Sequence, residues 1–300
     1  MRIGRSRRRL HALERLDPAV DYERIARDDA TLEFPWDLQQ SLSFALFRTY
    51  AVPSIGGLLH ETAEFEERTQ RRHDDTVLLL DAISTSGLDS PDGRAAVKRM
   101  NRMHGRYDIS NDDLRYVLAT FVVTPVRWIA AYGWRRQCRV EIEAAVAYYR
   151  RLGRLMGIRD LPETFEEFAD LMDAYEREHF RPDPRTRAVA DATLELLTTF
   201  YPQPTRRLVR VFSIAILDPH LRAALGYPSP SERAVRLSHG ALRLRGRIVG
   251  LLPARRTPQY ARDLERIRSY PGGYLVEHLG TFAPGERAEP AAPEPARAAS

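Results

Sequence analysis

This 300-residue sequence has very little cysteine, since Cys138 is the only one. A single cysteine excludes an internal disulfide framework and a zinc site built from several thiolates. It also agrees with a reducing compartment, so we expect a cytoplasmic protein. Long apolar runs are missing too, since no stretch reaches the ~18 consecutive apolar residues typical of a membrane-spanning helix. The basic start, "MRIGRSRRRLHALERL", lacks the apolar centre of a signal peptide.

Lysine is nearly absent, and the positive charge of the chain is confined to one end. Lys98 is the only lysine among 46 Lys and Arg residues. Residues 1–15 contain six arginines and one glutamate, which accounts for the net charge of +5. A nucleic-acid groove needs basic residues spread over a folded face, so we expect no specific nucleic-acid partner. Residues 1–29 are predicted to form a basic arm, either a solvated tail, which we favour, or a weak contact for an anionic membrane surface.

Strand signals are also lacking, with no period-two alternation and no Asn-Gly turn. Helical periods recur almost everywhere instead, and the apolar share of 43% indicates a globular protein. The sequence therefore predicts an all-α fold, a single globular domain of nine or ten helices over residues 30–282. Residues 283–300, rich in Pro and Ala, are predicted to be a disordered tail.

Several helices can be placed from their start signals. A hydroxyl residue followed three positions later by an acidic one predicts starts at Ser110 with Asp113, at Thr164 with Glu167, and at Ser229 with Glu232, where Pro230 occupies the first helical position. Pro125 is expected to kink or end the helix that begins after Ser110. Further helices are expected near residues 38–52, 64–84, 140–157, 186–200 and 204–217.

His104 lies on the apolar stripe of a predicted helix, in register with Val97, Met100 and Tyr107. A neighbouring stripe carries Arg99, Arg102 and Arg106. Two interpretations are open at this point. The residues alone favour a core histidine that is hydrogen-bonded to a carbonyl. The alternative is an axial ligand of haem, which needs one imidazole, an apolar slot and cations for its propionates.

Two other pairs could carry chemistry. Arg72 and Thr76 are one helical turn apart, although an isolated pair of this kind is more often a surface arginine and a threonine bonded to its own helix. Glu176 and His179 form Glu-x-x-His, half of a carboxylate-bridged di-iron site. No second copy exists, so an ion pair at a helix end is favoured. The sequence has no Gly-rich phosphate loop, no Gly-x-Ser-x-Gly and no His-Glu-x-x-His.

The order of these motifs resembles the MpaB/rubber-oxygenase family, which includes fungal oxygenases of the mycophenolic acid pathway and bacterial latex-clearing proteins. "RRHDDT" is followed 28 residues later by "RMNRMHGRYDISNDDLRY". Then come "YRRLGRLMGI", "FEEFADLMDAYEREHF", "YPQP" and "GGYLVEHLGTF". The resemblance runs from about residue 30 to residue 282 and is strongest to the MpaB branch.

The resemblance implies an all-helical oxygenase with haem b in a buried apolar pocket, which cleaves a C=C bond of an isoprenoid-like substrate with O2. It implies that His104 is the proximal haem ligand and that Arg72 and Thr76 support the oxygen side. Three arginines are then candidates for the haem propionates: Arg99, Arg102 and Arg106. The latex-clearing branch has a lysine just before the threonine, whereas this chain has Asp75, so a lysine-gated oxygen site is not expected. The fungal membrane anchor is not expected either.

The residues alone leave three other functions possible. A non-haem di-iron oxygenase would use Glu176 and His179 as metal ligands. A non-catalytic helical protein would bind a hydrophobic ligand in the same core. Nucleic-acid binding through the basic arm would weaken steeply with salt. Neither the substrate nor the oligomeric state can be predicted from the sequence.

Overall fold

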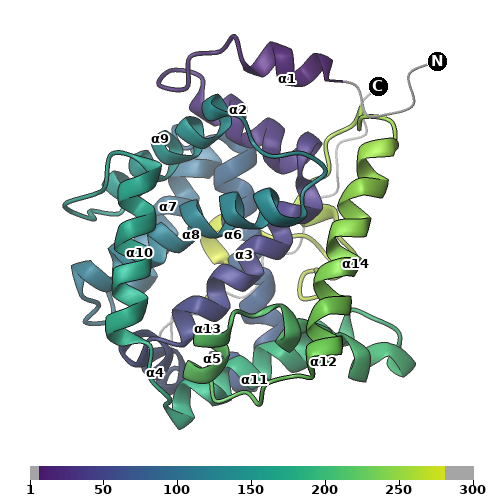
Figure 1. Ribbon diagram of the computed structural model, residues 1–300. Coiled ribbons are helices and arrows are strands. Elements are labelled where there is room, and N and C mark those ends of the chain that lie inside the picture. Colours follow the sequence, from purple (N-terminus) through teal and green to yellow (C-terminus); the bar gives the residue numbers. More distant parts are fainter. Residues whose placement is uncertain (1–6, 281–300) are drawn as a thin grey trace.

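The protein is helical throughout residues 7–280, the part that its computed structural model describes (Figure 1). This part contains fourteen α-helices and four short helical turns but no strand, which confirms the predicted all-α class. The α-helices are α1 (Arg8–Leu13), α2 (Tyr22–Asp28), α3 (Pro35–Tyr50), α4 (Pro53–Glu61), α5 (Glu64–Glu67), α6 (Thr69–Ser86), α7 (Pro91–His104), α8 (Asn111–Tyr132), α9 (Arg139–Leu155), α10 (Phe165–His179), α11 (Pro184–Thr199), α12 (Arg206–Ile216), α13 (Pro219–Ala224) and α14 (Glu232–Leu251). The short turns are η1 (Asp29–Glu33), η2 (Gln203–Thr205), η3 (Ala261–Asp263) and η4 (Val276–His278).

The prediction of nine or ten helices was too low because several helices are very short. Helices α1, α5 and α13 have six, four and six residues. One turn of helix shows no repeat of the apolar period, so these elements leave no signal in the sequence. Such helices depend on packing against the longer ones.

Two of the predicted helix starts are confirmed. At the start of α8, Ser110 Oγ accepts a hydrogen bond from the backbone N–H of Asp113 at 3.0 Å. At the start of α10, Thr164 and Glu167 form a reciprocal capping box. In both places the local chemistry of the helix N-terminus is enough to set the boundary.

The third predicted start was wrong by two residues. Helix α14 begins at Glu232, and its N-cap is Ser231 rather than Ser229. Ser231 Oγ accepts a hydrogen bond from the backbone N–H of Ala234 at 3.2 Å. Either serine can make this kind of bond, so the pattern of capping residues did not distinguish them.

Helix α8 runs through the hydrophobic core and packs against α3, α9 and α10. The side chains that it buries include Tyr116, Ala119, Val122 and Val123. Pro125 was expected to kink or end this helix; the helix does not end there but continues to Tyr132. In Figure 1, α10 and α14 flank the molecule on opposite sides of this centre. Helix α8 therefore forms a common wall for the elements that surround the site.

Helix α8 is also the one helix within residues 7–280 whose length and hydropathy would allow it to cross a membrane. The bent pair α3–α4, with 95° between its two parts, would be a second if it formed a broken span. Half of the apolar window of α8 is buried inside the protein. Buried core helices commonly have this length and composition.

The N-terminal arm is folded onto the domain where the structure describes it, which corrects the expectation of a solvated tail. Leu13 of α1 and Ile25 of α2 are buried, and both pack in one cluster with Ala144 of α9. Arg9 Nη1 lies 2.6 Å from a carboxylate oxygen of the buried Glu33. The charge pattern alone does not reveal this partner. Residues 1–6 of the arm and the predicted tail at 283–300 lie outside the described residues.

Residues 252–280, which follow α14, return across the molecule and bind along α6. Three aspartates of α6 accept hydrogen bonds from this C-terminal segment: Asp74, Asp75 and Asp81. Helix α7 contributes a further contact, since Arg99 Nε donates to the carbonyl of Leu279 at 2.5 Å. The segment thereby holds α6 and α7, the two helices with the predicted site residues, against the core.

Candidate active site

Arg72 and Thr76 are in direct contact on helix α6. Arg72 Nη1 donates a hydrogen bond to Thr76 Oγ1 at 2.7 Å, and that hydroxyl donates its own proton to the carbonyl of Arg72 at 2.8 Å. The guanidinium carbon of Arg72 also lies 5.1 Å from the ring centroid of Phe65, a cation–π geometry. Thr76 does bond to its own helix, as a helical threonine commonly does. It also fixes the orientation of the guanidinium.

His104 is the last residue of α7, which packs against α6. Its Nδ1 is buried and has no hydrogen-bond partner among residues 7–280. Burial, together with the nearby charge of Arg72, lowers the pKa of His104 to about 4. The imidazole is therefore neutral at pH 7, which is the form that binds a metal ion. The carbonyl partner expected for a core histidine is not found at this nitrogen.

Arg72, Thr76 and His104 line one cavity of about 260 Å³, called here the His104 cavity. Its wall comes from helices α3 to α9 and is mostly apolar. The apolar lining residues include Leu46, Ile55, Leu58, Leu79, Met100, Met103, Leu114, Val117, Phe121 and Met156. A hollow of this kind, with a few converging polar groups, is typical of a cofactor or small-molecule site.

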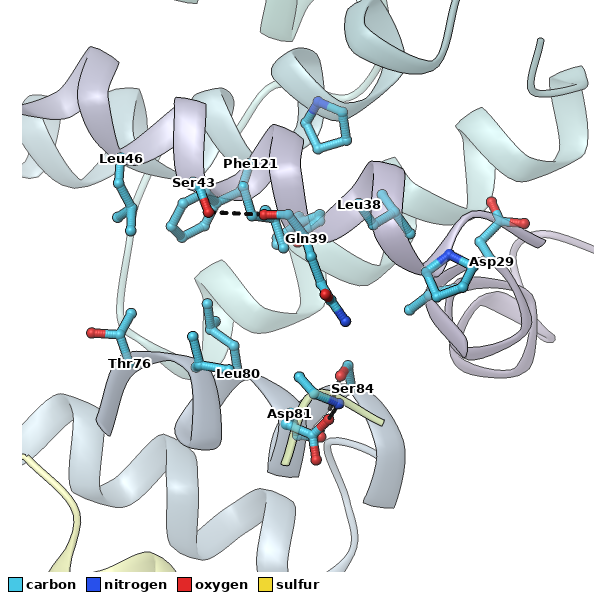
Figure 2. A pocket seen from close by; sticks show the side chains of 18 of the residues that line it. Asp29, Leu38, Gln39, Ser43, Leu46, Thr76, Leu80, Asp81, Ser84 and Phe121 are labelled. Carbon is cyan, nitrogen blue, oxygen red and sulfur yellow. Dashed lines mark hydrogen bonds between the residues drawn. The ribbon is translucent and has the colours of Figure 1, made fainter. Parts of the chain in front are cut away.

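A second cavity of about 190 Å³ lies beside the first, between α3 and α6. The two share seven lining residues: Leu46, Tyr50, Phe65, Thr76, Leu80, Phe121 and Leu152. Figure 2 shows this α3–α6 cavity, with Leu38, Gln39 and Leu46 of α3 on one side and Thr76 and Leu80 of α6 on the other. Leu46 and Thr76 lie at one end of the view, where the two cavities meet, and Asp29 lies at the other. The α3–α6 cavity is therefore elongated and adjoins the His104 cavity at Thr76.

Tyr50 belongs to the shared wall but was not singled out from the sequence. Its side chain is fully buried, and its hydroxyl has no hydrogen-bond partner among the described residues. Burial raises the pKa of Tyr50 to about 12, against the opposing influence of Thr193 and Arg72. The phenol therefore keeps its proton at pH 7 and can donate it to a bound molecule. Tyr50 lies at the end of the segment "FALFRTY" (residues 44–50), and nothing in the spacing of these residues indicates such a role.

The three arginines predicted for the propionates, Arg99 and Arg102 of α7 and Arg106 just after it, do not line either cavity. Arg99 is 4% exposed and donates to the carbonyl of Leu279, so it holds the C-terminal segment. Arg102 is exposed and Arg106 is half-buried. In the sequence these residues form a stripe next to that of His104. In the structure they lie outside the wall of its cavity. Their role at the propionates stays a prediction.

Glu176 and His179 are not brought together as metal ligands. Glu176 is 3% exposed, and both of its carboxylate oxygens accept hydrogen bonds from Arg48, with 2.6 Å between Arg48 Nε and Glu176 Oε1. His179 lies against Tyr175 instead, with 4.1 Å between ring centroids. Residues 7–280 contain no group of three or more His, Cys, Asp or Glu side chains that could hold a metal ion. The geometry thus gives no support to a carboxylate-rich di-iron centre in this region.

Asp75 occupies the position at which the latex-clearing branch has a lysine. The residue is 2% exposed and accepts a hydrogen bond from the hydroxyl of Tyr270, so it faces the C-terminal segment. Burial raises the pKa of the Asp75 carboxyl, and neither cavity includes this residue in its wall. The position therefore serves to attach the C-terminal segment to α6.

The chain is similar to a group of known oxygenases over most of its length. The family model for the ER-bound oxygenase mpaB/B′/Rubber oxygenase catalytic domain matches residues 38–250. The chain is 32% identical over 225 residues to the ER-bound oxygenase mpaB′ and 34% identical over 232 residues to the ER-bound oxygenase mpaB, both of Penicillium brevicompactum. It is 31% identical over 221 residues to the ER-bound oxygenase mpaB of Penicillium roqueforti (strain FM164). These matches cover 69%, 70% and 68% of this chain and 53%, 59% and 74% of the relatives. The chain thus spans little more than half the length of the first two.

Proposed function

The chain belongs to the MpaB/rubber-oxygenase family, and we propose from this premise that it is a haem-dependent oxygenase. The proposed reaction is the cleavage of a C=C bond in an apolar, isoprenoid-like substrate with O2. One observation supports the haem assignment above all others. It is the neutral imidazole of His104, whose buried Nδ1 lacks a partner within residues 7–280 and whose side chain lines a mostly apolar cavity.

The residues present fit a haem group. Haem requires an axial imidazole, an apolar slot and cations for its propionates. His104 supplies the imidazole, and the wall of the His104 cavity supplies the slot. Arg72 is the guanidinium in this wall, so it is a further candidate, beside Arg99, Arg102 and Arg106, for a cation at a propionate.

When bound, haem would supply the redox chemistry with O2, which no amino-acid side chain provides. His104 would hold the iron through its neutral imidazole. Arg72 would place its fixed charge either where negative charge develops on oxygen or against a propionate. Thr76 gives its proton to the carbonyl of Arg72, so it positions the guanidinium and does not act as a donor. Tyr50 is the group with a proton still to give where the two cavities meet, and the apolar wall excludes water.

A substitution at His104 tests this proposal. His104→Ala should purify with little haem and should consume no oxygen, and added imidazole should restore part of the bound haem by occupying the vacated space. The matched control is His179→Ala, which removes another helical histidine and should keep both properties. If His104→Ala retained the haem content and oxygen uptake of the unmodified protein, the ligand assignment would be wrong.

A further inference from the structure

Arg266 of the C-terminal segment lies in the wall of the α3–α6 cavity. Its guanidinium makes one hydrogen bond within residues 7–280, from Nη2 to Gln39 Oε1 at 2.9 Å, and no ion pair with a carboxylate there. Its Nε is buried and has no hydrogen-bond partner in the same part of the chain. Burial lowers the pKa of Arg266, against the opposing influence of Tyr201 and Asp74. An arginine stays charged at pH 7, so the cavity wall contains a positive charge that is poorly compensated.

A buried nitrogen without a partner does not by itself distinguish Arg266, because several other arginines within residues 7–280 have a buried Nε of this kind. Arg115, Arg135 and Arg150 each form an ion pair with an aspartate or glutamate. Arg222 donates to two backbone carbonyls. None of these four lines either cavity. Arg266 differs from them because a bound molecule in the cavity can supply the missing countercharge.

The acidic side chains in the wall of the α3–α6 cavity already have partners of their own. They are Asp29, Asp81 and Glu141. Both carboxylate oxygens of Glu141 accept hydrogen bonds from Arg135, at 2.7 and 2.6 Å. Burial raises the pKa of Asp29, and the charge of Glu141 and a hydrogen bond to it raise this pKa further, so Asp29 carries a proton. Asp81 Oδ2 lies 2.7 Å from Arg262 Nη1. These groups therefore neither neutralise Arg266 nor add an unbalanced negative charge that would repel an anion.

We propose that the α3–α6 cavity binds the anion of a long-chain carboxylic acid, with the carboxylate on Arg266 and the apolar chain directed toward Thr76. A guanidinium donates hydrogen bonds in a planar fork, which matches the two oxygens of a carboxylate. Gln39, the partner of Arg266 Nη2, extends from α3 toward α6 in the middle of Figure 2. The carboxylate is therefore expected between the two helices, midway along the cavity.

The apolar part of the ligand has a lined path from Arg266 to the His104 cavity. Helix α3 contributes Leu42 and Leu46 to the wall on this path, and α6 contributes Val77 and Leu80. Residues 39 and 46 are about 10 Å apart along α3, at 1.5 Å per residue. The path ends where the two cavities share their wall. Only the role of this molecule as a substrate, with its far end in the His104 cavity, rests on the proposed oxygenase function.

The wall favours a carboxylate over a phosphate or a neutral end group. Arg266 is the one arginine among the described lining residues. His73 lines the cavity too, but its Nδ1 lies 3.0 Å from Asp74 Oδ1. A phosphate monoester has a charge of about −1.5 to −2 at pH 7, so a single guanidinium would leave negative charge buried without a partner. A neutral group would leave the charge of Arg266 as it is. One positive charge thus matches one carboxylate.

Three probes with an eight-carbon chain test the proposal: octanoate, methyl octanoate and octyl phosphate. Their affinities are measured on the full chain at pH 8 by displacement of the neutral dye Nile red. Octanoate should bind about tenfold more tightly than its methyl ester, because hydrogen bonds between charged groups are stronger than those of a neutral ester. Octyl phosphate should bind more weakly than octanoate. Equal affinities for octanoate and the ester, tighter binding of octyl phosphate, or no displacement by octanoate would overturn the proposal.

Substitutions at position 266 tie the preference to the guanidinium. Arg266→Met should abolish the preference for octanoate and leave the affinity for the methyl ester unchanged, which also shows that the cavity is intact. If Arg266→Met fails to bind the ester, Arg266→Gln replaces it. Arg266→Lys keeps the charge and should retain part of the preference.

Arg268→Met is the matched control, because Arg268 is an exposed arginine of the same segment outside the cavity wall. It should keep the full preference for octanoate. A preference that survives the loss of charge at position 266, or that is lost equally in Arg268→Met, would contradict the proposed contact. Haem content and oxygen uptake do not enter these measurements, so the failure of one proposal is distinguishable from that of the other.

Discussion

Arg72 Nη1 lies 2.7 Å from Thr76 Oγ1, and the same hydroxyl donates to the carbonyl of Arg72 at 2.8 Å. The hydroxyl of Thr76 thus accepts one hydrogen bond from Arg72 and donates another to the same residue. Because a hydroxyl has only one proton to donate, Thr76 cannot also donate a hydrogen bond to a bound molecule. The contact makes Thr76 a positioning residue for the guanidinium that lines the His104 cavity.

Removal of the Thr76 hydroxyl should therefore lower activity through Arg72. Thr76→Val deletes a hydrogen bond to a charged group, worth about 1.5–3 kcal/mol, so kcat/KM for oxygen consumption should fall about 10- to 100-fold. Thr76→Ser keeps the hydroxyl and should retain most of the activity. Thr62→Val removes a hydroxyl from the same cavity without a contact to Arg72, and it should have little effect. Equal losses in the valine variants at 76 and 62 would contradict the positioning role.

The attachment of the C-terminal segment should depend on the charge of Asp74. Asp74 Oδ2 accepts hydrogen bonds from Arg268 N at 3.0 Å, Ser269 N at 2.9 Å and Ser269 Oγ at 2.7 Å. Burial alone raises the pKa of this carboxyl, but hydrogen bonds from His73, Ser269 and the backbone hold the pKa below its ordinary value. Because the pKa is lower in the folded state, the stabilisation is present above the unfolded pKa and is lost as pH falls through the folded pKa.

Asp74→Asn should accordingly destabilise the protein by about 2 kcal/mol or more at pH 7, since an amide cannot accept all three donors on charged oxygen. Urea unfolding at a series of pH values measures this difference. The difference between Asp74→Asn and the unmodified protein should shrink as the pH falls below about 4. Asp263→Asn changes an exposed aspartate of the same segment and should differ little from the unmodified protein. A difference that stays constant from pH 7 to pH 3 would show that the charge of Asp74 has no part in it.

Arg48 should be essential for stability because it neutralises a buried carboxylate. It bonds both oxygens of Glu176, and its Nη1 lies 2.6 Å from Asp218 Oδ2. Arg48→Met leaves Glu176 charged and buried, which should cost about 3–5 kcal/mol in urea unfolding. Arg127→Met breaks an exposed pair with Asp173 and should cost less than about 1 kcal/mol.

The double variant Arg48→Met/Glu176→Leu should be more stable than Arg48→Met alone, because no charge is then left buried without a partner. A double variant that is less stable than either single variant would show that packing, and not charge, dominates at this position. Haem content should be the same in Glu176→Leu as in the unmodified protein. A loss of iron in that variant without loss of fold would revive the di-iron alternative.

Two adjacent glycines of α4 should respond in opposite ways to alanine. A Cβ at Gly56 would collide with the carbonyl oxygen of Tyr50 and would lie 2.7 Å from Thr186 Cγ2, so α4 would have to move away from α11. Overpacking of this kind costs about 1–3 kcal/mol. A Cβ at Gly57 would meet only the end of the Arg185 side chain, at 2.9 Å from Cζ. Because that arginine can move and alanine favours helix over glycine, Gly57→Ala should be neutral or stabilising. Thermal unfolding of the two variants gives the comparison, and equal destabilisation would contradict it.

The sequence predicts those structural features that depend on interactions between residues only a few positions apart. Ser110 and Thr164 cap the helices that their neighbours indicate, since the hydrogen bond spans only three residues. The choice between Ser229 and Ser231 was missed because both serines offer the same local bond. The basic arm was misjudged because the partner of Arg9, Glu33, is set by packing and not by charge density.

The site could be predicted only in part, for the same physical reason. The order of motifs identified His104, Arg72 and Thr76, and the structure places all three in one cavity wall. The periodicity of α7 could not show that Arg99 is used by the C-terminal segment, 180 residues away in the chain. Tyr50 escaped notice because its significance lies in the absence of a hydrogen bond within residues 7–280, which no sequence pattern records.

The central claim is that His104 holds the iron of a haem, and the optical spectrum of the purified protein tests it most directly. The spectrum is recorded for the oxidised and the dithionite-reduced protein, together with the iron content, for the unmodified chain and for His104→Ala. The account predicts a Soret band with about one haem per chain, a shift of that band on reduction, and loss of the band in His104→Ala. Stoichiometric iron without a Soret band in the unmodified protein would contradict it.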